Sequence, residues 1–177
     1  MMEKKKSVRS KTDDVMILVM KLGAMSSRIN QLLEDHVSAS DASGPMFAIN
    51  YIALSIDNVV GAFELGVNKN LQPGEEGTAE ALYSDLKILK DVRDANKFNS
   101  ESLNRDIDNV IMYGEKVIDA VNKGITGDEF SEAGILLLKS TMILLNDTFM
   151  FMRPQLPIDV KDDLGISKIM KGISING

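Results

Sequence analysis

The 177-residue chain has no cysteine, no tryptophan and a single histidine, and only 5% of its residues are aromatic. The absence of cysteine excludes disulfides, thiolate metal sites and a cysteine nucleophile, and it favours a reducing compartment. We therefore expect a cytoplasmic protein. Because hydrophobic residues still make up 44% of the chain, the core is predicted to be aliphatic and rich in methionine.

Membrane-targeting features are also missing. The basic start at residues 1–6 is followed by the polar run 7–14, so the apolar segment of an export signal is lacking. The longest apolar stretch, 135–152, contains Lys139 and Asp147, and each such charge costs about 2.5–3.5 kcal/mol at the centre of a membrane span. We expect no transmembrane segment, and we predict that this stretch is a buried helix of a bundle.

Charge is unevenly distributed along the chain. The net charge is −6, but residues 1–12 carry five cations and one acid, a net charge of +4, which leaves −10 on the rest. An acidic body repels the phosphates of nucleic acids, so we do not expect it to bind them. We predict that residues 1–12 form a flexible basic arm, residues 13–153 a helical bundle domain and residues 154–177 a C-terminal tail.

Five segments have apolar residues at alternating steps of three and four, which is the pattern of an amphipathic α-helix. They predict an all-α fold, a bundle of about five helices with a short C-terminal amphipathic tail. The last core helix is apolar nearly all round, so it is expected to lie at the centre of the bundle. The five helices are expected near residues 13–37, 44–67, 78–97, 100–122 and 130–152.

Local signals predict several helix ends and contacts. Thr126 and Glu129 have the spacing of a capping box at the start of the fifth helix. Gly124 is expected to adopt the left-handed conformation that ends the fourth helix. Gly114, on the apolar face of the fourth helix, predicts a close approach of a neighbouring helix. Lys90 is predicted to pair with Asp94 on the outer face of the third helix.

The first helix carries an uninterrupted apolar series of heptad type, which Met16, Val19 and Met20 widen at its start. One neighbouring helix need not cover so much apolar surface, so the chain is predicted to form a homodimer. Packing within one chain is the alternative. The series consists of Val15, Leu18, Leu22, Met25, Ile29, Leu32 and His36.

The C-terminal tail follows Pro154 and Pro157, which end the last core helix. Its apolar residues predict a short amphipathic helix that either folds back onto the bundle or docks on another chain. Methionines and phenylalanines at 46–47 and 149–152 form two further clusters, which fill the core or make an adaptable docking groove. The predicted partner contacts in the tail are Leu164, Ile166, Ile169, Met170 and Ile173.

Catalytic motifs are missing from the sequence. It has neither a glycine-rich phosphate loop nor a Gly-x-Ser-x-Gly elbow. The histidine, His36, is a candidate general base or metal ligand, with a purely structural place near the helix end as the alternative. Acidic pairs at helical spacing are candidates for Mg²⁺, although helix capping and surface salt bridges also explain them. These pairs are Glu129 with Glu132, Asp91 with Asp94, and Glu115 with Asp119.

These patterns favour a non-enzymatic helical-bundle protein that acts through protein–protein contacts, as an adaptor, small chaperone, inhibitor or assembly subunit. No cofactor and no metal site is expected, and the sequence does not name the partner. Two alternatives stay open. One is a metal-dependent all-α phosphohydrolase that uses the paired acids, and the other is a helical protein that interacts with membranes.

Overall fold

The fold is all-α. It is taken from a computed structural model, which describes residues 11–36, 79–96, 98–125, 127–152 and 166–175. Within these residues there are helices and no strand, so the predicted all-α bundle is confirmed. The helix expected near 44–67 lies outside the described residues. The described helices are α1 (Lys11–His36), α3 (Ala79–Asp94), α4 (Glu101–Asn122), α5 (Gly127–Met152) and α6 (Ile166–Met170).

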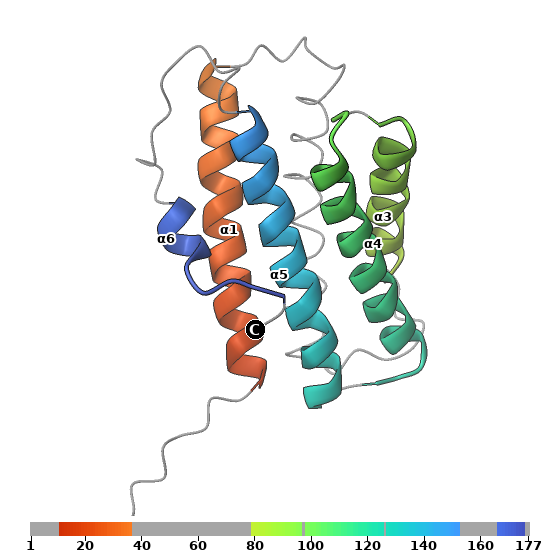
Figure 1. The fold of residues 1–177 in the computed structure, drawn as a ribbon. Helices are drawn as coiled ribbons and strands as arrows, with labels where there is room; N and C mark the ends of the chain where they lie inside the picture. The colour runs from red at the N-terminus through yellow and green to blue at the C-terminus, as the bar shows by residue number, and fades with distance from the viewer. Residues whose placement is uncertain (1–10, 37–78, 97, 126, 153–165, 176–177) are drawn as a thin grey trace, which may run out of the picture.

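Helix α5 occupies the middle of the arrangement (Figure 1). It packs against α1 on one side and α4 on the other, and α3 packs on α4. Helices α1 and α5 run in the same direction and α4 runs the opposite way. The central position follows from the sequence of α5, because side chains such as Leu137, Met142 and Leu145 are fully buried. A helix without a polar face lowers its free energy by packing against neighbours on several sides.

By length and composition alone, α5 is also apolar enough to cross a membrane. The segment Asp128–Phe151 passes this test, and 56% of its most apolar window is buried inside the protein. The core helix of a globular protein passes the same test, so the result is weak evidence for a membrane span. Lys139 and Asp147 lie within the segment.

Helix α4 has well-defined caps at both ends. At its start the Ser100 hydroxyl accepts a hydrogen bond from the Leu103 amide at 3.3 Å. At its end Gly124 has a φ of 72°, which confirms the predicted left-handed residue. The amide of Gly124 donates to the Val121 carbonyl at 3.1 Å, and the amide of Ile125 donates to the Ala120 carbonyl at 2.9 Å. This pair of bonds is a Schellman motif, which satisfies carbonyls that the helix leaves free.

Helices α3 and α4 approach closely at Gly114. A Cβ atom at this position would lie 2.6 Å from Leu86 Cδ1, so the predicted close approach is confirmed. Ion pairs between exposed side chains flank the contact. Lys90 Nζ lies 2.6 Å from Glu115 Oε1, so the ion pair of Lys90 joins α3 to α4 instead of closing on Asp94 within α3. The hydrogen bond from Lys90 to Glu115 also raises the pKa of the lysine.

The apolar series of α1 is buried as far as its side chains are described. Val15, Leu22 and Met25 are fully shielded, and Val19 on the widened flank is buried as well. Met20 on the same flank is 71% exposed. The side chains of residues 29–36, His36 included, lie outside the described part. Self-association through this flank stays a prediction.

Candidate functional site

A groove lies between the C-terminal part of α5 and α6. Helix α5 contributes Asn146, Phe149 and Met150, and residues 166–168, 170 and 171 supply the opposite wall. The hollow has a volume of about 490 Å³. Two segments that the sequence analysis treated separately, the methionine and phenylalanine cluster at 149–152 and the amphipathic tail, thus meet in one place.

The groove exists because α6 is anchored to the bundle and then ends sharply. Ile166 is buried in the core, and α6 contacts both α1 and α5. The chain turns directly after α6 at Gly172, whose φ is 80°. The amide of Ile173 donates to the Met170 carbonyl at 2.9 Å and closes this turn. A left-handed residue favours glycine, which explains why α6 stops here.

The chemistry of the groove is divided between its floor and its rim. Phe149 and Ile166 form a buried apolar floor, whereas Met150 is 46% exposed. Lys168 and Lys171 are exposed and line the wall on the α6 side. As far as its residues are described, the lining therefore contains two cations and no acid, on a chain whose net charge is −6.

The predicted partner contacts of the tail lie as follows. Ile166 is buried, while Ile169, Met170 and Ile173 are partly buried and pack against the core. Ile166 and Met170 also line the groove. Leu164 lies outside the described residues. The described part of the tail thus folds back onto the bundle, and contact of these residues with a partner stays a prediction.

The cluster at 149–152 divides between core and surface. Phe149 is buried, and Phe151 meets Phe98 edge to face, with the ring centroids 6.1 Å apart. Met150 faces the groove. The Met152 side chain and the second cluster, at 46–47, lie outside the described part. The sequence did not predict that Asn146 lines the groove. A polar residue in an apolar helix does not indicate which other helix it will contact.

A carboxyl pair joins α4 to α5 near the same end of the bundle. Asp106 faces Asp147, and the enclosed Oδ2 of Asp106 has no hydrogen-bond partner as long as both groups are ionised. Two carboxylates only accept, so a proton held by Asp106 turns the contact into a hydrogen bond. Burial first, and the Asp147 carboxyl second, raise the pKa of Asp106 to about 7, although Arg105 opposes the shift.

Asp147 follows the groove residue Asn146 along α5, but neither acid of the pair lines the groove. The side-chain amide of Asn146, which lines the groove, lies 3.4 Å from Asp147 Oδ1. A signal for this site was present in the sequence, since Asp147 interrupts an apolar helix and Asp106 flanks the apolar face of α4 between Leu103 and Ile107. What the sequence did not indicate is that the two acids face each other.

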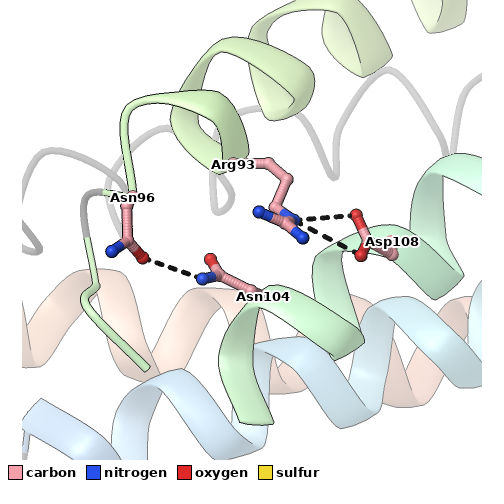
Figure 2. Close-up of polar contacts among 4 residues, drawn as sticks. All are labelled: Arg93, Asn96, Asn104 and Asp108. Carbon is pink, nitrogen blue, oxygen red and sulfur yellow. Dashed lines mark hydrogen bonds and ion pairs between the residues drawn. The ribbon is translucent and has the colours of Figure 1, made fainter. Parts of the chain in front are cut away.

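A second polar cluster closes the turn between α3 and α4 (Figure 2). Arg93 Nε donates to Asp108 Oδ1 at 3.1 Å, and Asn104 Nδ2 donates to Asn96 Oδ1 at 2.8 Å. Asn96 and Asn99 have φ values of 50° and 49°, a conformation that asparagine tolerates better than most residues. The hollow beside the cluster has side chains of both charges, and Arg93 is engaged by Asp108. We therefore assign the cluster a structural role in shaping the turn.

The predicted Mg²⁺ candidates are not brought together. Glu115 pairs with Lys90, and Asp119 Oδ2 lies 2.9 Å from Lys123 Nζ, which raises the pKa of Lys123. Among the residues that the structure describes, no group of three or more histidine, cysteine, aspartate or glutamate side chains is placed to hold a metal ion. The other two pairs, Asp91 with Asp94 and Glu129 with Glu132, consist of exposed side chains.

Comparison with known proteins adds no family to this description. No protein-family model, no curated protein and no solved structure matches the chain.

Proposed function

We propose that this chain is a helical-bundle protein that acts through protein–protein contacts, and that the groove between α5 and α6 is its contact surface. The observation that carries the proposal is Met150, a large apolar side chain that is 46% exposed at the edge of a hollow with a buried apolar floor. Methionine adapts its shape to different partners, and it is enriched at the centres of protein interfaces.

The composition of the lining supports a macromolecular partner over a small molecule. Sites for small molecules enclose a few converging polar groups that fix the orientation of the ligand. Here Ser167, Lys168 and Lys171 are exposed at the wall, Asn146 is half-buried, and the fully buried residues of the groove, Phe149 and Ile166, are apolar. A partner's apolar side chains fit such a hollow, and burying one of them is worth roughly 1.5–3 kcal/mol.

Site-specific photocrosslinking tests this function. A benzophenone amino acid replaces Met150 in the full-length protein expressed in its own host, and Tyr83, which is 61% exposed on α3, is replaced in the same way as the control. Illumination is expected to give a discrete adduct with a second protein from position 150 and none from position 83. The proposal is wrong if position 150 gives no adduct, or if both positions give the same adducts.

A third position addresses self-association. The same amino acid at Met20, the exposed methionine on the flank of α1, reports on contacts between copies of the chain. Adducts of twice the monomer mass are expected there if α1 forms the predicted homodimer. Only monomer at this position would contradict a dimer through α1 and would leave the groove proposal intact.

A further inference from the structure

We infer that the partner segment in this groove is an acidic amphipathic helix, whose apolar side chains enter the hollow and whose carboxylates meet Lys168 and Lys171. The inference rests on the proposed function and adds the chemistry of the partner. Three properties of the groove carry it, namely its charge, its hollow shape and the backbone of its walls.

Charge complementarity comes first. Among the residues that the structure describes, the lining holds two cations and no anion, although acids outnumber cations in the chain as a whole, 26 to 20. Lys168 and Lys171 lie three residues apart, and the Lys171 amide donates to the Lys168 carbonyl at 3.3 Å, so both lysines belong to one turn of the chain. Neither forms an ion pair that the structure describes. A basic partner is repelled here, and an acidic one is attracted with a strength that falls as salt is added.

The same charges disfavour a second copy bound groove to groove. In a two-fold symmetric contact each patch meets itself, so Lys168 and Lys171 of the two copies would be brought together. Like charges across an interface cost free energy. The groove therefore suits a different surface, and the predicted contact between copies belongs to the flank of α1.

The shape favours a side chain over a lipid surface. Peripheral membrane binding uses apolar side chains that project beyond the protein surface. In this groove Phe149 and Ile166 are 5% and 3% exposed and lie beneath the rim. A hollow with such a floor receives inserted side chains, whereas a flat bilayer spans its mouth without filling it.

The secondary structure of the groove walls favours a helical partner segment over an extended one. Both sides of the groove are helical over 146–150 and 166–170, and the amides of 146–150 already bond to carbonyls earlier in α5. An extended peptide finds no free strand edge there. A helix instead places apolar side chains on one face at spacings of three and four, with acids on the flanks, which matches an apolar floor beside a basic wall.

Binding of synthetic helices tests the inference. The probes are a panel of fluorescent amphipathic peptides that differ in the register of their leucines, each made with glutamate flanks and as a twin with lysine flanks. Fluorescence anisotropy with the full-length protein is expected to show at least one glutamate peptide binding about tenfold more tightly than its lysine twin, since two exposed ion pairs replace two repulsions. The difference is expected to shrink at high salt.

Charge reversal supplies the matched control. The double variant Lys168→Glu with Lys171→Glu is expected to bind the lysine twin more tightly than the glutamate peptide. The variant Lys87→Glu with Lys116→Glu changes the net charge equally at exposed positions on α3 and α4, and it is expected to keep the original preference. Circular dichroism verifies that both variants are folded.

The inference is overturned if no peptide binds, if both twins bind equally, or if the control variant reverses the preference as well. Stronger binding to phosphatidylserine vesicles than to any peptide, lost in the groove variant alone, would overturn it in favour of a lipid surface. Its failure is distinguishable from that of the proposed function. A specific crosslink from position 150 without a preference for acidic peptides removes only the inference about the partner's chemistry.

Discussion

Replacing Gly114 by alanine offers a direct test of the packing between α3 and α4. The added Cβ would lie 2.6 Å, 2.7 Å and 3.1 Å from Cδ1, Cδ2 and Cγ of Leu86. Favourable contacts between carbon atoms lie near 3.5–4.0 Å, so the leucine has to move by about an ångström. Leu86 is 2% exposed, which leaves it no open space to move into.

Two contributions of opposite sign determine how Gly114→Ala changes the free energy of unfolding. Overpacking a well-packed core costs about 1–3 kcal/mol, and replacing glycine by alanine inside a helix gains about 1 kcal/mol. We therefore expect Gly114→Ala to lower the free energy of unfolding by up to about 2 kcal/mol. Gly23 provides the control, because its Cβ would meet nothing within 4 Å on an exposed position of α1. Gly23→Ala is expected to stabilise the protein by about 1 kcal/mol.

Shortening the Leu86 side chain should reverse the sign of the change in unfolding free energy that Gly114→Ala causes. Leu86→Ala by itself costs about 2–5 kcal/mol because it leaves a cavity. In that background Gly114→Ala no longer clashes, and it is expected to stabilise by about 1 kcal/mol. Urea unfolding followed by circular dichroism at one pH measures the four variants and the unchanged protein. The reasoning is refuted if Gly114→Ala stabilises the otherwise unchanged protein as much as Gly23→Ala does. It is also refuted if Gly114→Ala still destabilises the Leu86→Ala variant.

Four further predictions address the acid pair, a helix cap, the tail and metal binding. With its pKa raised to about 7 from 3.8, Asp106 holds a proton in the folded protein that it has lost in the unfolded chain, so its contribution to stability is complete below about pH 4 and disappears as the pH rises through about 7. Asp106→Asn, which can donate to Asp147 at every pH, is expected to raise the melting temperature at pH 8 more than at pH 5, and equal shifts at both would contradict the assignment. Ser100→Ala removes the cap of α4 and should cost about 1 kcal/mol in urea unfolding, whereas no measurable change would show that the cap is unimportant. Ile166→Ala should cost about 2 kcal/mol or more if α6 folds back as described, and an unchanged melting curve would mean that α6 adds nothing to the bundle. Millimolar Mg²⁺ or Mn²⁺ is expected to leave the melting temperature unchanged, and a clear rise would support the alternative of a metal-dependent phosphohydrolase.

The helices themselves were determined by the sequence. Apolar residues at steps of three and four predicted α1, α3, α4 and α5 to within a few residues, because these contacts are local and depend only on the helical period. The ends were equally local. The hydroxyl of Ser100 and the left-handed conformation of Gly124 act on amides and carbonyls only a few residues away. The central position of α5 also followed from its own composition, since a helix that is apolar nearly all round packs against neighbours on several sides.

Which residues from different helices meet was decided only by the tertiary structure. Lys90 has Asp94 four residues further along its own helix and Glu115 on α4, and the packing of α3 on α4 places Glu115 Oε1 at 2.6 Å from the lysine Nζ. Asp106 and Asp147 are 41 positions apart, and nothing in either helix pattern indicates that they face each other. The groove arises in the same way, because the fold-back of α6 brings residues 166–171 beside 146–150. Helical periodicity specifies which face of a helix is buried. The rotation and axial shift between two packed helices instead depend on how all their side chains interlock. These two geometric quantities determine where the groove forms.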